Sequence, residues 1–411
     1  MSILSNKRIV LGVTGSIAAY KAADLASKLT QAGAQVDVIL TGATEKFVTP
    51  LTFQSVTGRR AYTDRDLWGS EAHVLHVGLG HAADLLVIAP CTANTIAKLA
   101  HGQADNLLAV TALAMRAPLL IAPAMDGGMY DHPATQENVE TLKSRRAAFI
   151  GPAEGHLASG FSGVGRMLET AEIIGHIRNV LGRSGPLAGK RIVVTAGGTQ
   201  EPLDPVRVLT NRSSGKQGYA LAQAALELGA QVSLITTPTA LPPPVGAKVI
   251  PVETAKQMLE AVLTEAAKSD VLIMAAAVAD FRPKDRAKDK IKKEAGIPQI
   301  ELEATEDILK TVAGQRSATE CPRVVVGFAA ESQDLLENAV HKLESKGLDF
   351  IAANDISGND AGFAVETNRV TLLFADGRKE SLPLLNKTEV AEIILGWVSK
   401  LLESYAHSRN L

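Results

Sequence analysis

The sequence is short of several features that mark particular classes of protein. Aromatic residues make up only 4% of the chain, and its two cysteines, Cys91 and Cys321, lie far apart. Few aromatic side chains argue against stacking on nucleic-acid bases, and two distant cysteines supply neither a disulfide framework nor the spacing of a zinc site. The formal net charge is only -2, so no overall positive field attracts nucleic acid or an anionic membrane. We therefore expect no nucleic-acid partner and no membrane partner.

Long apolar runs and targeting signals are also missing. No run approaches the roughly 18 apolar residues of a membrane-spanning helix, and the opening MSILSNKR leads into a short apolar run without signal-peptide features. We therefore expect a cytoplasmic protein. The 411 residues, 46% of them hydrophobic, are enough for two or three globular domains.

The sequence does contain a pattern that occurs twice. Short β-branched runs, which are typical of strands buried on both faces of a parallel sheet, recur in the same order in each half. The matching runs are residues 7–13 and 190–196, 33–40 and 229–236, and 83–90 and 269–276. Between the first two runs, Ala19, Ala22, Ala26 and Leu29 follow helical spacing and Gly33 gives a stop signal. The pattern predicts an α/β fold of two tandem doubly wound domains with mainly parallel sheets, flavodoxin-like or Rossmann-like.

The boundary between the copies is marked by a cluster of Gly, Ser and Pro at residues 179–189. This predicts domains over 1–185 and 186–411. The second copy is longer than the first because a polar, Pro-interrupted stretch within 199–218 follows its first strand. Open α/β sheets bind ligands at the carboxyl ends of their strands, so this insertion is placed to form a site.

The motif GVTGSIAAYK, residues 12–21, has the pattern of a strand, a glycine turn and a helix start. We expect Ser16 to cap the helix and its free backbone N–H groups to bind a phosphate. The spacing is not GxGxxG, which favours a mononucleotide over a dinucleotide. Any short strand-to-helix turn also needs glycine and a capping serine, so the motif alone leaves both interpretations open.

Two further segments, 90–108 and 122–135, also follow buried strands. In the first, Thr92, Asn94 and Thr95 either cap a helix or line a site. Together, the three strand ends predict one pocket of small residues at one edge of the sheet.

His76 lies just before the strand that leads to this pocket, and His73 and His81 compete with it for any catalytic role. Each of these histidines can also be a surface or core residue. The Gly-rich stretch 156–167 is expected to be irregular and too long for a tight turn, which makes it either a lid or a plain surface loop.

In the second half, Asn211, Ser213, Ser214 and Gly215 offer donors for a phosphate or an acyl group, or only cap a helix. The basic segment 275–293 leaves a buried strand and is either a solvated face or part of a site. Phe328 follows another strand and suits either a base-stacking position or the core. Lys342 and Lys346 share one helical face, where they can meet phosphates or solvent.

Taken in order, these motifs resemble a known family. The first half is similar to the flavoprotein family of cysteine decarboxylases, and nearly the whole chain resembles the bifunctional phosphopantothenoylcysteine decarboxylase/phosphopantothenate-cysteine ligase family of coenzyme A biosynthesis. The resemblance implies ligation of 4'-phosphopantothenate to L-cysteine through an acyl-cytidylate formed from CTP, with Mg2+ balancing the triphosphate charge. It also implies FMN-dependent decarboxylation to 4'-phosphopantetheine through a thioaldehyde, whose C=S group takes up the electrons as carbon dioxide leaves. Homo-oligomers are implied as well, with flavoprotein trimers joined through ligase dimers.

The resemblance also assigns residues. His76 is the active-site base of the decarboxylase, Asn211 contacts the acyl-cytidylate, and Lys290 assists amide formation. FMN binding is implied for Gly15, Ser16, Thr41, Thr92, Asn94, Thr95 and Met125. Nucleotide binding is implied for Ala275, Ala276, Ala277, Asp280, Lys290, Glu306, Asp307, Ile308, Leu309, Phe328, Lys342 and Lys346. The metal ligands are left unknown.

Two residues depart from the family pattern at the catalytic positions of the decarboxylase. Asp126 stands where the family usually has Asn, and Ser159 stands where it usually has Cys. A protonated Asp126 would donate to the substrate carboxylate as an amide does, whereas Ser159 can relay a proton but cannot act as a redox thiol. An alternative function is therefore an active ligase fused to a flavin-binding, non-catalytic regulatory or scaffold domain. Tandem NAD-linked oxidoreductases are a further alternative that the missing GxGxxG disfavours.

Overall fold

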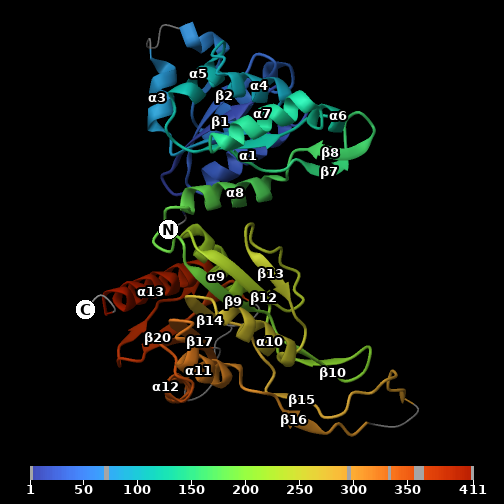
Figure 1. The fold of residues 1–411 in the computed structure, drawn as a ribbon, viewed down its shortest axis with the longest axis vertical. Coiled ribbons are helices and arrows are strands. Elements are labelled where there is room, and N and C mark those ends of the chain that lie inside the picture. Colours follow the sequence, from blue (N-terminus) through green and yellow to red (C-terminus); the bar gives the residue numbers. More distant parts are fainter. Residues whose placement is uncertain (1–2, 69–73, 294–297, 332–334, 356–364, 409–411) are drawn as a thin grey trace. The chain divides into compact units, whose positions relative to one another are not determined.

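The computed structural model describes residues 3–68, 74–293, 298–331, 335–355 and 365–408 (Figure 1). The chain divides into two compact units, Met1–Leu181 and Gly182–Leu411. Within the described residues, none of the helices combines the length and the apolar character that crossing a bilayer requires. His73 lies outside the described residues.

The first unit is built on a parallel sheet whose strand order is β3-β2-β1-β4-β5-β6. Alternate residues of β1 face opposite sides, so that Ile9 and Leu11 join one core cluster and Val10 joins the other. Burial on both faces explains why the strands are continuous apolar runs. The strands are β1 Arg8–Val13, β2 Gln35–Leu40, β3 Ala61–Thr63, β4 Leu85–Cys91, β5 Leu119–Pro123 and β6 Ala148–Phe149.

Helices pack on both faces of this sheet, as expected for a doubly wound fold. They are α1 Ala19–Gln31, α2 Pro50–Thr57, α3 Leu75–Ala82, α4 Ala93–His101, α5 Leu107–Ala114, α6 Gly127–Tyr130, α7 Pro133–Ser144 and α8 Thr170–Gly182, with single turns of 3-10 helix at Thr44–Lys46 and Asp64–Trp68. The prediction of α1 is confirmed, because Ala19, Ala22, Ala26 and Leu29 are buried along one face.

The prediction that Ser16 caps α1 is wrong. The N-cap residue is Ala18, whose side chain makes no capping bond. Residues 14–18 instead form a tight turn, in which the Ser16 backbone N–H donates to the Thr14 carbonyl at 2.8 Å and the Ser16 Oγ accepts from the Ala18 N–H at 3.3 Å. This turn lies against the next loop so closely that a Cβ at Gly15 would come within 2.5 Å of the Ala43 Cβ.

The expectation of an irregular stretch at 156–167 is also wrong. β7 Ala153–His156 and β8 Ser162–Arg166 form an antiparallel hairpin. Its glycines serve close packing, since a Cβ at Gly165 would meet the Met125 carbonyl oxygen at 2.2 Å. The Met125 N–H in turn donates to the Gly165 carbonyl at 3.0 Å, which fastens the hairpin to the end of β5. Without side chains at these glycines, the strand alternation is hidden in the sequence.

The second unit repeats the plan on a larger, mixed sheet. The strand order is β13-β12-β9-β14-β17-β18-β20-β21, parallel as far as β18 and antiparallel at β20 and β21. The order β12-β9-β14 matches β2-β1-β4 of the first unit, which confirms the α/β prediction. The strands are β9 Arg191–Ala196, β12 Gln231–Thr236, β13 Lys248–Pro251, β14 Val271–Met274, β17 Val324–Glu331, β18 Phe350–Asp355, β20 Val370–Phe374 and β21 Lys379–Ser381.

The helices of the second unit also cover both sheet faces. They are α9 Lys216–Glu227, α10 Ala255–Ala266, α11 Ile308–Thr319, α12 Leu335–Ser345 and α13 Lys387–Ser408. A short pair, β19 Thr367–Asn368 and β22 Leu385–Asn386, precedes α13.

The predicted insertion after the first strand of this unit forms part of a projecting arm (Figure 1). The arm consists of two hairpins, β10 Gln200–Pro202 with β11 Val208–Thr210, and β15 Phe281–Pro283 with β16 Leu302–Ala304. Asp204 connects them, because its Oδ1 accepts from the N–H groups of Val206 and Arg207 at 2.7 Å and its Oδ2 accepts from the Ile291 N–H at 3.2 Å. The insertion is therefore ordered by a buried carboxylate.

Candidate functional sites

The first unit contains a cavity of about 560 Å³ at the carboxyl ends of β1, β4 and β5. The predicted site residues that line it are Gly15, Ser16, Thr92, Met125, Asp126 and Ser159. The β7–β8 hairpin contributes His156–Ser159 and Gly165–Met167 to the same cavity. Three neighbouring strand ends and the hairpin thus form one pocket, as the small-residue segments predicted.

Other residues assigned to this site lie elsewhere in the unit. Thr41 is buried and its hydroxyl lies 3.0 Å from that of Thr44, and Asn94 is exposed in the first turn of α4. His76 lies half-buried in the first turn of α3 and does not line the cavity. These three assignments stay predictions.

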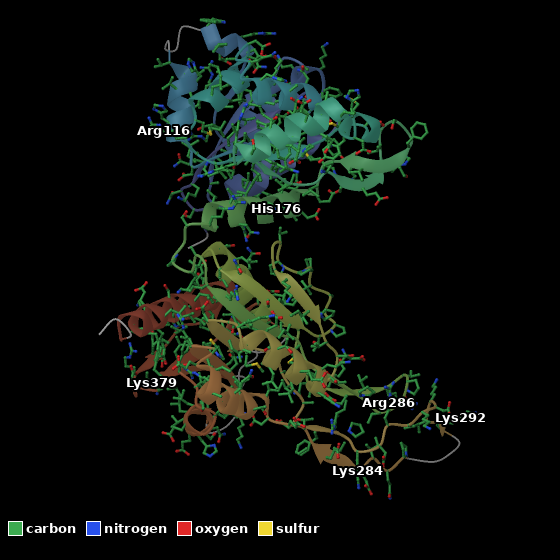
Figure 2. All side chains as sticks on the ribbon, in the orientation of Figure 1. Arg116, His176, Lys284, Arg286, Lys292 and Lys379 are labelled. Carbon is green, nitrogen blue, oxygen red and sulfur yellow. The ribbon has the colours of Figure 1, made fainter. Side chains whose placement is uncertain are left out.

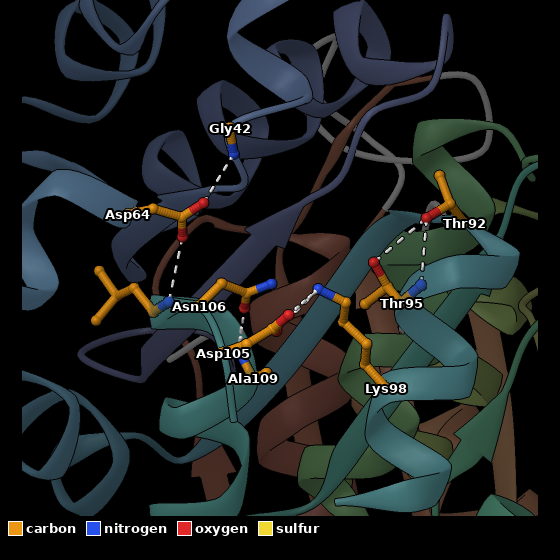
Figure 3. A network of polar contacts seen from close by, with 9 residues as sticks. Gly42, Asp64, Thr92, Thr95, Lys98, Asp105, Asn106 and Ala109 are labelled. Carbon is orange, nitrogen blue, oxygen red and sulfur yellow. Dashed lines mark hydrogen bonds and ion pairs between the residues drawn. The ribbon is translucent and has the colours of Figure 1, made fainter. Parts of the chain in front are cut away.

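Thr92 and Thr95 are engaged at the start of α4 (Figure 3). The Thr92 hydroxyl is the helix N-cap and accepts from the Thr95 N–H at 3.4 Å. Thr95 is buried, so the capping alternative explains its position, while Thr92 both caps the helix and lines the cavity. Thr14, which the sequence analysis missed, joins β1 to β4: its hydroxyl donates to the Pro90 carbonyl at 2.9 Å and accepts from the Thr92 N–H at 3.0 Å.

A second contact fixes the loops at this edge of the sheet (Figure 3). The Asp64 carboxylate accepts from the Gly42 N–H at 3.0 Å and from the Leu107 N–H at 3.2 Å. It therefore ties the loop after β2 to the start of α5, while Lys98 of α4 pairs with Asp105 just before α5. These contacts hold the loops that surround the predicted residues.

Two cations line the first cavity and share one carboxylate. Lys21 Nζ lies 2.9 Å from Glu169 Oε1, and Arg166 pairs with the same oxygen. The hydrogen bond from Lys21 holds the pKa of Glu169 below its ordinary value. Two positive charges against one negative charge leave this side of the cavity suited to an anionic group. Lys21 ends the predicted motif 12–21 and Arg166 lies in the predicted stretch 156–167, whereas Glu169 lies outside the predicted segments.

The two departures from the family pattern contact each other. Ser159 Oγ donates to Asp126 Oδ2 at 2.7 Å, while Asp126 Oδ1 caps the short helix α6 by accepting from the Gly128 N–H at 3.0 Å. Both carboxylate oxygens therefore accept hydrogen bonds. In this arrangement Asp126 acts as an acceptor and holds the tip of the β7–β8 hairpin at the cavity.

The second unit contains a cavity of about 420 Å³, again at the carboxyl edge of its sheet. It brings together predicted residues from the loop before α9, the end of β14, the start of α11, β17 and α12. These are Asn211, Ser213, Ser214, Gly215, Ala275, Ala276, Ala277, Asp280, Glu306, Asp307, Ile308, Leu309, Phe328, Lys342 and Lys346. Phe328 also packs against the core beneath it, as the core interpretation expects, and the base-stacking interpretation stays a prediction.

Asn211 is oriented by the strand end opposite it. Its Nδ2 donates to the Val278 carbonyl at 3.0 Å, and a Cβ at Gly198 would meet the Asn211 carbonyl oxygen at 2.7 Å. Gly215 caps α9 with φ +76° and offers no side chain to the first helical N–H groups. A helix start of this kind favours a bound anion.

Positive charge reaches this cavity from α12. Lys346 Nζ lies 3.2 Å from Asp307 Oδ2, and Asp307 Oδ1 caps α11 by accepting from the Lys310 N–H at 3.2 Å. The contact therefore links the residue that follows α12 to the N-cap of α11. It places the Lys346 ammonium group beside the segment 306–309 that the resemblance assigns to the nucleotide.

Lys290 does not line the cavity. It is exposed on the arm, next to Ile291, whose carbonyl accepts from Arg207 at 3.1 Å. Figure 2 shows other basic side chains of this segment, Lys284, Arg286 and Lys292, on the same arm. The solvated-face interpretation therefore fits this part of the basic segment in the structure.

Comparison with known proteins identifies the family to which the chain belongs. A family model described as "Flavoprotein" matches residues 2–182, and one described as "DNA/pantothenate metabolism flavoprotein C-terminal domain" matches residues 187–402. The coenzyme A biosynthesis bifunctional protein CoaBC of Bacillus subtilis is 46% identical over 402 residues, covering 97% of this chain and 98% of the relative. The chain belongs to the family of bifunctional CoaBC proteins of coenzyme A biosynthesis.

A second relative, from Vibrio cholerae and with the same name, is 44% identical over 397 residues, which cover 96% of this chain and 98% of the relative. A crystal structure of the C-terminal domain of a CoaBC protein is 44% identical and covers 54% of this chain and all of that chain, with a TM-score of 0.46. Family membership confirms the recognised resemblance and the prediction of a bifunctional coenzyme A biosynthesis enzyme.

Proposed function

We propose that the chain first ligates 4'-phosphopantothenate to L-cysteine, using CTP and Mg2+, and then decarboxylates the product to 4'-phosphopantetheine with FMN. We assign the ligase to residues 186–411 and the decarboxylase to residues 1–185. The observation that carries the proposal is the second cavity, in which segments far apart in the sequence bring Asn211, Asp280 and Phe328 together. The expected homo-oligomer, with flavoprotein trimers and ligase dimers, and the cytoplasmic location belong to the same proposal.

The residues of the second unit suit activation of a carboxylate by a nucleotide. The start of α9, Lys342 of α12 and Lys346, which directly follows α12, offer positive charge for a triphosphate, which carries about four negative charges. Asn211 stands at the start of this anion site, where it is proposed to contact the acyl-cytidylate. The carboxylate attacks the α-phosphate in line, pyrophosphate leaves, and the cysteine amine then displaces the nucleotide.

Lys290 is proposed to assist that second step. Since the residue lies on the arm and outside the cavity, its ammonium group has to be brought to the ligand by the arm. We therefore expect Lys290 to act when the cysteine amine attacks, whereas other residues bind the triphosphate.

The first cavity fits a flavin mononucleotide. Large apolar side chains line it while remaining solvent-exposed, namely Ile17 at 59%, Tyr20 at 62% and Met129 at 52% exposure, and such a surface suits a planar ring. Lys21 and Arg166 supply positive charge for a phosphate. FMN, when bound, supplies the reversible two-electron oxidation that converts CH2–SH to C=S and allows carbon dioxide to leave. His76 is proposed as the base that positions or deprotonates the substrate.

A second candidate function is favoured by the contact between Asp126 and Ser159. The two carboxyl oxygens of Asp126 already have partners within this unit, namely the Ser159 hydroxyl and the Gly128 N–H, so the side chain is engaged in holding the hairpin and α6. The contact thus supports an active ligase fused to a flavin-binding domain that does not turn over. We keep the bifunctional enzyme as the main proposal because the cavity, its apolar rim and its cations are all present.

The experiment that tests the proposal is mass spectrometry of the products formed from 4'-phosphopantothenate, L-cysteine, CTP and Mg2+. The bifunctional enzyme yields 4'-phosphopantetheine and carbon dioxide. The second candidate yields 4'-phosphopantothenoylcysteine and stops there. Absence of both products with correctly folded protein contradicts the ligase assignment.

A further inference from the structure

One wall of the second cavity carries a cluster that the assigned site residues do not include. The cluster consists of Gln217, Asn354, Asn368 and Lys387, all of which line the cavity. Gln217 lies in the first turn of α9 and Lys387 is the first residue of α13. Two helix starts and two asparagines therefore meet at one end of the cavity.

Strand register explains why the two asparagines face the same side. Asn354 of β18 is paired with Val370 of β20, and Asn368 comes two residues before Val370. Side chains two residues apart in an extended strand point to the same face. Ala352 and Val370 belong to the core cluster that also holds residues of α9 and α13, so this face is the one that these helices cover.

Hydrogen bonds fix the orientation of the Asn368 amide. Gln217 Nε2 donates to the Lys387 carbonyl at 3.2 Å, which leaves Gln217 Oε1 to accept from Asn368 Nδ2 at 2.8 Å. A flipped Asn368 would place its oxygen against the oxygen of Gln217. The carbonyl group must therefore occupy the other position, where the side chain meets the cavity.

The oxygens left over are buried acceptors. Asn368 is 3% exposed and Asn354 is 8% exposed. Within the described residues, the Oδ1 atoms of both asparagines have no hydrogen-bond partner. Buried polar atoms in native proteins are generally paired, so two adjoining exceptions on a cavity wall indicate that a ligand supplies the partner.

The surrounding charges restrict what this ligand is. Lys387 is buried at the start of α13, and Lys216 at the start of α9 is paired with Glu366. An isolated cation would be repelled by Lys387 and by the two helix starts. A cation bound to a phosphate chain would not be repelled, because the negative phosphates pair with Lys387 and accept hydrogen bonds from the helical N–H groups. Hard divalent cations take amide oxygens as ligands, and an Asn side chain binds Mg2+ in protein kinases.

We propose that Asn368 and Asn354 bind, through their Oδ1 atoms, the divalent cation that accompanies the triphosphate. Gln217 is a positioning residue that holds the Asn368 oxygen toward the cavity. This inference rests on the proposed function in one respect, which is that the second cavity takes a nucleoside triphosphate. It assigns the metal ligands that the sequence left unknown.

The test measures binding of Mn2+ to the full chain loaded with CTP, by the loss of the free-ion signal in electron paramagnetic resonance. Loss of a residue that only supports a metal ligand typically lowers affinity about 10- to 100-fold, so loss of a ligand should cost at least that much. Asn368→Ala is expected to weaken Mn2+ binding by at least that factor while leaving CTP binding in EDTA unchanged. Asn338→Ala, the same substitution at an exposed position of α12, is the matched control and should bind Mn2+ as the wild type does.

A softer ligand provides a second readout. Asn368→Cys should gain a CTP-dependent thiolate-to-Cd2+ absorption band beyond any signal from the wild-type Cys321, which is partly exposed. This result does not depend on the alanine variant being stable.

Two results would overturn the inference. Asn368→Ala could bind Mn2+ as tightly as the wild type, or it could lose CTP equally with and without Mn2+, which would make Asn368 a nucleotide contact only. If the wild type binds no CTP, the proposed ligase fails instead. The metal site is then tested with Mn2+ and inorganic pyrophosphate, which needs no base recognition, and unchanged Mn2+ binding by Asn368→Ala would again overturn it.

Discussion

The two units share a strand plan but differ in how their sites are assembled. In the second unit, the assigned residues from five separate segments meet in one cavity, with Lys290 outside it. In the first unit, the strand ends form the cavity while His76, Thr41 and Asn94 lie apart from it. The strand ends behave alike because parallel strands bring their carboxyl ends to one edge. The difference arises at His76 and Asn94, which lie on helices whose direction the strand pattern does not determine, and at Thr41, which directly follows β2 but is buried beside Thr44.

The strongest test of this difference between the two units is to replace His76. If His76 is the base of the decarboxylase although it lies outside the cavity, His76→Asn should retain FMN and lose about 100- to 10,000-fold in carbon dioxide release. The measurement is decarboxylation of supplied 4'-phosphopantothenoylcysteine, with His81→Asn on the same helix as the control. Near-wild-type turnover would show that the first cavity works without His76.

Asn211 offers the corresponding test of the second unit. Asn211→Ala should lower ligation by about 100- to 1,000-fold, as is typical when a group that contacts a transition state is removed. Decarboxylation of supplied 4'-phosphopantothenoylcysteine should be unchanged, because the two cavities lie in separate units. Equal loss of both activities would mean that the substitution damages the fold.

Lys290 sharpens the distinction between binding and catalysis in the second unit. Lys290→Gln should leave pyrophosphate release from CTP largely intact and slow amide formation by about 100-fold, since it removes a group that acts in the second step only. Rapid-quench measurement of the two half-reactions separates them, with Lys292→Gln on the same arm as the control. A parallel decrease in both half-reactions would make Lys290 a nucleotide-binding residue.

The contact between Asp126 and Ser159 predicts a smaller effect. Ser159→Ala removes one exposed hydrogen bond and should destabilise the closed hairpin by about 0.5–1.5 kcal/mol. Hydrogen exchange at residues 157–161 should rise, whereas Ser162→Ala, in β8 of the same hairpin, should leave it unchanged. Unaltered exchange in Ser159→Ala would show that the contact does not hold the hairpin.

The acid response of the arm should produce the smallest effect. Burial alone would raise the pKa of Asp204, but N–H donors from Val206, Arg207 and Ile291 and the Arg207 charge hold it below its ordinary value. The ionised form therefore stabilises the fold above the unfolded pKa of about 3.9, and this contribution disappears as pH falls through the lower folded value. The melting temperature of the second unit in Asp204→Asn should thus lie below wild type at neutral pH and approach it as pH falls through the lowered pKa of Asp204. A difference that persists in acid would contradict this origin.

The sequence allowed the repeated strands, α1 and the insertion after β9 to be predicted, because β-branched runs and helical spacing are local signals. It did not allow the β7–β8 hairpin to be predicted, since glycine carries no side chain to show alternation. Asn368 could not be found either, because the contact that orients it joins residues 151 positions apart. The ion pair between Lys21 and Glu169 could not be predicted for the same reason, because it joins residues 148 positions apart.

The most direct test of the account supplies L-cysteine labelled in its carboxyl carbon, together with 4'-phosphopantothenate, CTP and Mg2+, and follows the label. The account predicts that the label first enters 4'-phosphopantothenoylcysteine and then leaves as carbon dioxide while unlabelled 4'-phosphopantetheine accumulates. Label that stops in 4'-phosphopantothenoylcysteine would leave the ligase and replace the decarboxylase by a flavin-binding domain. Label that enters neither compound would contradict the account as a whole.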